Sequence, residues 1–369
     1  MVHFRCKQCF FDFTNAPLIK DVLKDDIEMV ERHLKNGADP NGSRCCGLTL
    51  LHYAVMNNNL NMCQLILENN ANPNLTEFGY CWTPLHYAAK RGNLEICQLL
   101  VSKGAAINAV GYDGQTALYF AVSKGEISLT KYLLELNANP NLKLRRSRWT
   151  PLHYAAMKGD LEISRLLVSN GATIDAFTSD GRTPLCWSVI ERKVSMTKYL
   201  LEQGANPNLK FDKSQCTPLH YAARDGELEI CYLLLSSGAL MDALDASKWT
   251  PLHFAARYGN LEICRLLISS GASVNALDDS KWTPLHYAAR YSKLEICLLL
   301  VSNGAEINCL TSKNDTPLML AYCNVNDIYS YISEYLLANK TKFSDEIMRF
   351  RPKDFRTVFP DYDCDLLDS

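Results

Sequence analysis

Six of the eight histidines occupy matching positions along the chain, and these are the residues best suited to carry out chemistry. They are His52, His86, His153, His220, His253 and His286. A recurring imidazole could bind zinc or transfer protons. If each histidine lies on its own helix of a stack, however, successive rings are ~8–10 Å apart, whereas zinc ligands converge at about 2 Å from the metal. We therefore expect each ring to hydrogen bond to the backbone of a neighbouring hairpin.

Other catalytic signatures are missing from the sequence. It contains no Gly-rich phosphate loop, no HExxH motif and no set of kinase motifs. A single CxxC, Cys6 to Cys9, could contribute to a zinc site, but it has no second, properly spaced pair. The nearby phenylalanines, such as Phe10 and Phe11, could instead cover the apolar end of the first repeat. We expect no enzyme activity, no cofactor and no bound metal.

The histidines belong to a block, Thr-Pro-Leu-His-Tyr-Ala-Ala, that opens a repeated unit. The block stands almost unchanged at Thr83, Thr150, Thr217, Thr250 and Thr283. With its weaker copies, it begins ten units near residues 16, 49, 83, 116, 150, 183, 217, 250, 283 and 316. A period of 33 or 34 residues is typical of stacked repeats, in which each unit buries its apolar side against the next.

Each unit reads as two short helices. In the third unit, Thr83 can cap a helix that starts at Pro84, and Gly92 can end it. Asn93 can cap a second helix over residues 94–102. The position that stops this second helix is held only by Gly or Asn, the residues that reach positive φ most easily. These residues are Gly37, Asn70, Gly104, Asn137, Gly171, Gly204, Gly238, Gly271 and Gly304. The looser stop after the first helix holds Arg192 and Ser292, which we interpret as irregular joints.

This pattern closely resembles the ankyrin repeat family. The resemblance rests on the Thr-Pro-Leu-His block, the Leu-Glu-Ile-Cys-x-Leu-Leu run and the Gly-Ala-x-x-Asn step. It implies an all-α solenoid of stacked helix-turn-helix units with short β-hairpin fingers. The expected domains are an N-terminal extension (1–15), the array (16–340), and a C-terminal cover with an acidic tail (341–369).

Composition sets broad limits on the partners and the cellular compartment. Lys and Arg number 38 against 40 Asp and Glu, so bulk charge favours no particular partner. Six units place Cys or Ser at one core site, which indicates a small buried side chain rather than a disulfide. Free thiols in such number suit a reducing compartment. The chain shows no signal peptide and no membrane span, so we expect a monomeric array in the cytoplasm or the nucleus.

In the resembled family, partners bind the hairpin tips and the exposed ends of the first helices, which line a concave groove. Here those positions are rich in cations and aromatic rings, the types that dominate binding hot spots. The candidate partner-binding residues are Trp82, Lys90, Arg91, Tyr112, Lys124, Arg145, Arg146, Arg148, Trp149, Lys158, Arg224, Trp249, Arg257, Tyr258, Trp282, Arg290 and Tyr291. Alternatively, the tryptophans pack flat on neighbouring hairpins and the cations are merely solvated.

The leading hypothesis is a non-enzymatic protein-interaction scaffold or adaptor that holds an extended, acidic or phosphorylated segment of another protein. A variant of this hypothesis is a client-recruiting subunit of a ubiquitin ligase, or a pathogen effector acting on host proteins. A further alternative is nucleotide or single-stranded nucleic-acid binding, with bases stacked on aromatic rings. The near-neutral charge weighs against nucleic acid.

Overall fold

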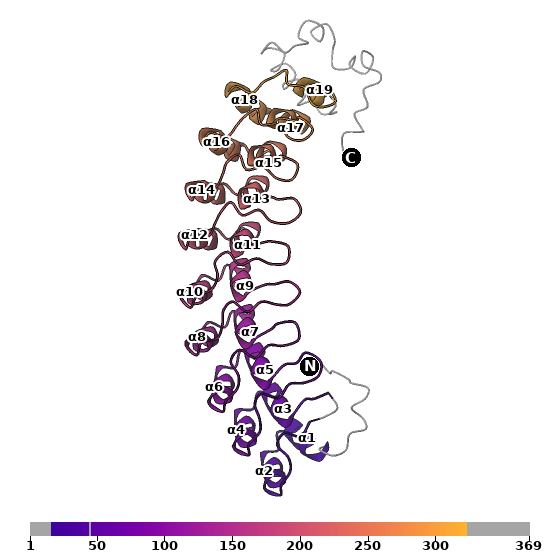
Figure 1. Cartoon of the computed structure of the whole chain (residues 1–369), viewed down its shortest axis with the longest axis vertical. Helices are drawn as coiled ribbons and strands as arrows, with labels where there is room; N and C mark the ends of the chain where they lie inside the picture. Colours follow the sequence, from indigo (N-terminus) through magenta and orange to yellow (C-terminus); the bar gives the residue numbers. More distant parts are fainter. Residues whose placement is uncertain (1–15, 44–45, 323–369) are drawn as a thin grey trace. The chain divides into compact units, whose positions relative to one another are not determined.

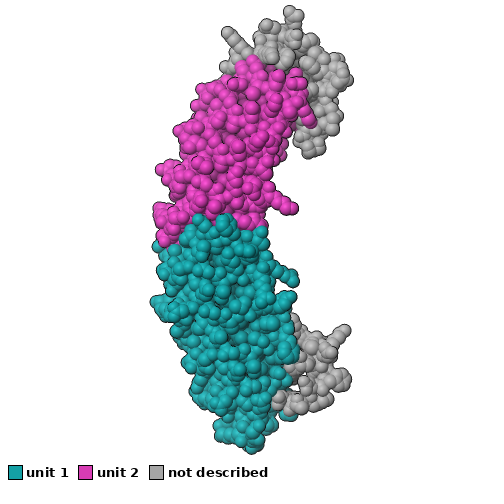
Figure 2. Space-filling model, in the orientation of Figure 1, with its two compact units in different colours: residues 1–179 teal, residues 180–369 magenta. Residues whose placement is uncertain are grey.

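The computed structural model describes residues 16–43 and 46–322, which divide into two compact units, residues 1–179 and 180–369 (Figures 1 and 2). The first helices of unit 1 are α1 (Ala16–Leu23), α3 (Leu50–Met56), α5 (Pro84–Arg91), α7 (Ala117–Lys124) and α9 (Pro151–Lys158). Its second helices are α2 (Ile27–Lys35), α4 (Leu60–Glu68), α6 (Leu94–Ser102), α8 (Ile127–Glu135) and α10 (Leu161–Ser169).

Unit 2 continues the same alternation. Its first helices are α11 (Pro184–Ile190), α13 (Pro218–Asp225), α15 (Pro251–Tyr258), α17 (Pro284–Arg290) and α19 (Pro317–Tyr322). Its second helices are α12 (Val194–Glu202), α14 (Leu228–Ser236), α16 (Leu261–Ser269) and α18 (Leu294–Ser302). Within each unit, first helices pack on their own second helices and on the next first helices, as α5 packs on α6 and α7 and α15 on α16 and α17. The expected stack of helix pairs is confirmed. The CxxC and the segment 341–369 lie outside the described residues.

The first helix of a unit begins where the block predicts. Thr83 is the N-cap of α5, Pro84 occupies the first turn, and Gly92 closes the helix with φ 75°. The opening residue is extended, so the Thr83 hydroxyl can meet the third helical residue, His86. An amide hydrogen at the first helical position has no acceptor within the helix. Proline, which lacks this hydrogen, therefore starts the helix without losing a hydrogen bond.

The second helix completes the core of the unit. Asn93 caps α6 by accepting a hydrogen bond from the Ile96 amide at 2.9 Å. Ala88 and Ala89 of α5 and Cys97 of α6 are fully buried. The small side chains let the helices approach closely, and burial raises the pKa of the Cys97 thiol to about 12. The prediction of a small, buried core site is therefore confirmed.

Both stop positions impose a left-handed backbone. All nine predicted Gly and Asn residues after the second helices have φ between 61° and 96°. Arg192 and Ser292 both have φ 54°, the same conformation that glycine adopts at Gly92 or Gly226. The positive φ is therefore kept at these two joints, and both residues adopt it despite their side chains. The joints still differ from the glycine ones, because α11 and α17 each end one residue earlier than α5 or α13.

The loops between a second helix and the next first helix are the fingers, and in each unit they project on the side of the odd-numbered helices (Figure 1). A finger folds back on itself: the Leu144 amide donates to the Trp149 carbonyl at 2.9 Å. Fingers also bond to their neighbours, as when the Arg145 amide donates to the Asp113 carbonyl at 2.8 Å. Among residues 16–43 and 46–322, the finger backbone forms two isolated β-bridges, and no extended β-strand is present.

Replacing Gly114 by alanine is expected to destabilise unit 1 by about 2–4 kcal/mol, because strain and overpacking combine there. Gly114 has φ 89°, and an added Cβ would stand 2.5 Å from the Lys143 carbonyl oxygen. Gly104→Ala is the matched control: its φ is 87°, but nothing lies within 4 Å of an added Cβ. Urea denaturation followed by circular dichroism compares the two. Equal losses would show that the contact between fingers contributes nothing.

Candidate partner-binding surface

The block histidines form hydrogen bonds that link neighbouring repeats. The Thr49 amide donates to His52 Nδ1 at 3.1 Å, and His52 Nε2 therefore donates to the Trp82 carbonyl at 3.1 Å. The same bridge to the next finger joins His86 to Gln115 and His253 to Trp282. Burial lowers the pKa of His52 and of His286 to about 4, so both rings are neutral at pH 7. The expected hydrogen bonds to the neighbouring hairpin are confirmed.

A second set of bridges joins the bases of neighbouring fingers. Asn141 Oδ1 accepts from the Thr173 amide at 2.8 Å, and its Nδ2 donates to the Gly171 carbonyl at 2.8 Å. Asn208 makes the same pair of bonds in unit 2. The amide side chain thus serves a donor and an acceptor of the next repeat. The recurring polar residues of the motif hold repeats together and leave the variable positions free for other uses.

The candidate cations of unit 1 lie on the finger side and are exposed. Lys90, Arg91, Lys124 and Lys158 stand at the ends of first helices, and Arg145, Arg146 and Arg148 occupy one finger. Lys158 Nζ donates to the Ser123 carbonyl at 2.5 Å. None of these seven cations forms an ion pair with another described residue. The ion pairs shown for unit 1 lie within the first helix pair, His33–Asp21 and Lys35–Glu31.

Aromatic rings contact one of these cations, Lys90. Lys90 Nζ lies 4.5 Å from the centre of the Trp82 ring and 5.9 Å from that of Phe120. Trp82 is only 6% exposed, so its ring supports Lys90 and offers little surface of its own. Partial burial, followed by the positive charge of Lys124, lowers the pKa of Lys90. Tyr112 is exposed, and Trp149 is half-buried against Tyr154.

Unit 2 gathers its candidates into one aromatic cluster around Arg257. The guanidinium carbon of Arg257 lies 4.9 Å from the ring centre of Tyr291, 5.4 Å from Trp249 and 5.9 Å from Tyr258. Trp249 and Trp282 are half-buried and pack on Tyr287 from either side, with ring centres 4.3 and 4.8 Å away.

The other unit 2 candidates lie around this cluster. Arg224 differs from the unit 1 cations because it pairs with Asp225 at 2.7 Å. Arg290 is half-buried at the end of α17. The finger tryptophans pack on aromatic rings of the first helices. The sequence had suggested instead that they pack flat on neighbouring hairpins.

Sequence reasoning missed the aromatic residue that follows the block histidine. Tyr154, Phe254 and Tyr287 are the floor on which the finger tryptophans rest. Their recurrence in the Thr-Pro-Leu-His-Tyr block was the available signal. We treated it as part of the folding motif, although in space it forms the base of the candidate surface.

A further unpredicted feature is a strained position two residues before each block. All nine residues there have positive φ: Gly47, Cys81, Gly114, Arg148, Gly181, Gln215, Lys248, Lys281 and Asn314. Three repeats have glycine at this position, and three have lysine or arginine. A side chain in this conformation costs about 1–2 kcal/mol, and such strain tends to persist at functional sites. The sequence alone did not reveal this requirement for a positive φ, because the residue types at the position vary.

Arg148→Gly is therefore expected to stabilise unit 1 by about 0.5–1 kcal/mol, since glycine relieves a φ of 57° but has more freedom to lose on folding. Thermal and urea denaturation test this expectation. The Arg148 side chain is exposed, so the substitution removes no buried contact. A loss of stability would mean that the arginine contributes to the fold.

The described residues also bear on metal binding and on membrane insertion. In residues 16–43 and 46–322, no three His, Cys, Asp or Glu side chains are placed to hold a metal ion. Over the same residues, no helix combines the length and the apolar character needed to cross a bilayer.

The fold and this surface define a class: stacked helix pairs whose fingers and first-helix ends present variable side chains on a frame that repeats along the chain. Family comparison agrees, because the model for ankyrin repeats matches residues 18–111, 72–143, 107–178, 136–211, 174–245, 219–311 and 275–346. The chain belongs to the ankyrin repeat family, whose repeats are protein-binding modules and generally not catalytic.

Similar proteins differ widely in their names. The chain is 36% identical over 113 residues to human ankyrin repeat and SOCS box protein 16, covering 30% of this chain and 24% of that protein. It is 30% identical over 211 residues to the Neurospora crassa ankyrin repeat protein nuc-2, covering 56% of this chain and 19% of that protein. It is 33% identical over 127 residues to the human transient receptor potential cation channel subfamily A member 1, covering 34% and 11%. The chain spans less than a quarter of each of these proteins.

Proposed function

We propose that this chain is a non-enzymatic interaction scaffold whose finger side binds an extended, acidic or phosphorylated segment of another protein. The observation that carries the proposal is the group of exposed cations in unit 1 that have no acidic partner among the described residues. Arg145, Arg146 and Arg148 crowd one finger, and Lys124 and Lys158 stand on neighbouring first helices. Guanidinium groups bind carboxylates and phosphates through charge-assisted hydrogen bonds.

The contrast with unit 2 supports this assignment. There, three cations near the fingers are paired: Arg182 with Asp180 at 3.1 Å, Arg224 with Asp225 at 2.7 Å, and Lys248 with Asp279 at 2.8 Å. A paired cation needs no partner from outside. We assign the main anionic contact to unit 1, and contacts with apolar or aromatic side chains of a partner to the Arg257 cluster of unit 2.

The aromatic geometry favours a protein segment over single-stranded nucleic acid. Stacking of bases requires exposed ring faces. Trp82 is 6% exposed, and the rings of Trp249 and Trp282 pack against Tyr287. These rings contribute more to holding cations and fingers in place than to offering flat platforms.

Fluorescence anisotropy with three labelled probes tests the proposal on the full chain. The probes are a Glu-rich 15-residue peptide with two phosphoserines, its Gln and Ser counterpart, and oligo-dT of matched charge. We expect the acidic peptide to bind at least about tenfold more tightly than the other two and to weaken as salt rises. Tighter binding of oligo-dT would favour nucleic acid instead, and equal binding of the neutral peptide would overturn the role of the cations.

A further inference from the structure

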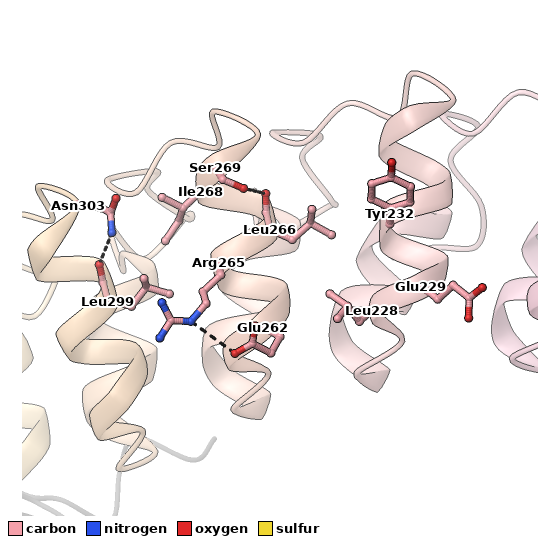
Figure 3. Close-up of a pocket in the computed structure, with 10 residues that line it drawn as sticks. All are labelled: Leu228, Glu229, Tyr232, Glu262, Arg265, Leu266, Ile268, Ser269, Leu299 and Asn303. Atoms are coloured by element: carbon pink, nitrogen blue, oxygen red, sulfur yellow. Dashed lines mark hydrogen bonds and ion pairs between the residues drawn. The ribbon is translucent and has the colours of Figure 1, made fainter.

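The outer side of unit 2, formed by the second helices, carries a hollow that the finger-side site does not use. Its volume is about 830 Å³, and it is lined by residues of α14, α16 and α18. Figure 3 shows Leu228 and Tyr232 on α14 and Leu266 on the neighbouring α16, with Leu299 on α18. The floor is therefore largely apolar, and it lies on elements that the stack holds rigidly.

The repeats supply an internal control for this surface. The position directly after the buried core site of each second helix faces outward. In eight helices it holds Glu31, Gln64, Gln98, Lys131, Arg165, Lys198, Arg265 and Leu298, and in α14 it holds Tyr232. Tyr232 is 61% exposed and makes no hydrogen bond or ion pair with any described residue. Since seven repeats have a polar residue there, stacking does not require the tyrosine.

Charge restricts what could cover the hollow. Glu262 pairs with Arg265 at 3.4 Å, so the one lining cation is already neutralised. Glu229 forms no ion pair with a described residue, and in Figure 3 it extends from α14 on the side away from α16. The exposed strip of Leu228, Tyr232 and Leu266 thus lies between two carboxylates. An occupant that combines apolar side chains with a nearby basic residue would complement both features.

We propose that this hollow binds an amphipathic helix of a second protein, with leucine-like side chains against Tyr232 and Leu266 and a lysine or arginine beside Glu229. A helix fits better than an added strand because the walls are helices with no free backbone edge to pair. The site is separate from the finger-side surface and does not depend on it. A chain with both surfaces would hold an acidic segment on the fingers of unit 1 and a basic amphipathic helix on the second helices of unit 2.

The probe is a fluorescein-labelled 18-residue helix with leucines at i, i+3, i+4 and i+7 and lysines elsewhere, added to the full chain. Tyr232→Gln, which installs the residue found at Gln98, is expected to weaken binding at least about tenfold without changing the melting temperature. Glu229→Gln is expected to weaken it about threefold and to reduce its salt dependence. Leu240→Gln is the matched control, because this leucine is also 61% exposed but does not line the hollow, and binding should stay within about twofold.

Three results would overturn the proposal. One is equal binding by the wild-type chain and Tyr232→Gln. Another is equal binding of a helix with glutamates in place of the lysines. The third is a dimer in sedimentation that Tyr232→Gln abolishes, because the hollow would then be a contact between two copies of the chain.

Discussion

Lowering the pH from 7 to 4.5 is expected to unfold much of the array in mild urea that leaves it folded at pH 7. The cause is the set of buried block histidines. Burial lowers the pKa of His52 and of His286 from 6.5 to about 4, and it lowers the pKa of His86, His220 and His253 as well. These rings stay neutral when folded and take up protons once unfolded.

The direction of the effect follows from proton linkage. Because the folded pKa values are the lower ones, the stabilisation is fully present above pH 6.5 and is lost as the pH falls towards 4. One pKa unit corresponds to about 1.4 kcal/mol, so His52 and His286 alone would account for about 3 kcal/mol each. Urea midpoints measured by circular dichroism between pH 8 and 4.5 provide the test.

A single variant isolates one histidine. The amide group of His253→Gln can still donate to the Trp282 carbonyl, which His253 Nε2 contacts at 3.2 Å, but it does not titrate. The slope of stability against pH should become shallower by up to one proton, or about 1.4 kcal/mol per pH unit. Midpoints that stay level down to pH 4.5 in the wild-type chain would contradict this assignment.

The triple variant Arg145→Glu, Arg146→Glu, Arg148→Glu is expected to weaken binding of the acidic phosphopeptide by at least about 100-fold. Each charge-assisted hydrogen bond contributes about 1.5–3 kcal/mol, and reversal replaces attraction by repulsion. All three side chains are exposed, so the melting temperature should change little. Anisotropy titration and thermal denaturation measure the two effects.

Two comparisons sharpen this prediction. Arg257→Glu should reduce binding less, because that guanidinium is already engaged with the rings of Trp249 and Tyr291. Arg148→Gly should lose part of the binding while gaining stability, which separates a binding role from a folding role. If the triple variant bound the peptide as the wild-type chain does, the finger could not be the anionic contact.

Most of the fold could be predicted from the sequence because each unit repeats its own start and stop signals. Thr83, Pro84 and Gly92 mark one helix, and Asn93 begins the next at the residues observed. The histidine bridges were also predictable, since even spacing excluded a shared metal. Repetition makes such signals visible in one chain because each position is sampled several times.

The remaining features depend on contacts that residue types alone do not reveal. Arg192 and Arg148 hold left-handed conformations that their residue type does not predict. Trp82 was predicted on the surface, yet it is almost buried beneath Lys90. The contrast between the seven candidate cations of unit 1 without an ion pair and the three paired cations of unit 2 depends on side-chain distances. Whether the candidate residues bind a partner stays a prediction.

Hydrogen–deuterium exchange with the acidic phosphopeptide bound tests the central claim most directly. The claim is that a partner binds the side chains that take no part in stacking the repeats. Exchange is expected to slow in residues 143–149 and at the ends of α5, α7 and α9, and to stay unchanged in α6, α8 and α10. Slower exchange confined to those second helices, with the finger unaffected, would contradict the account.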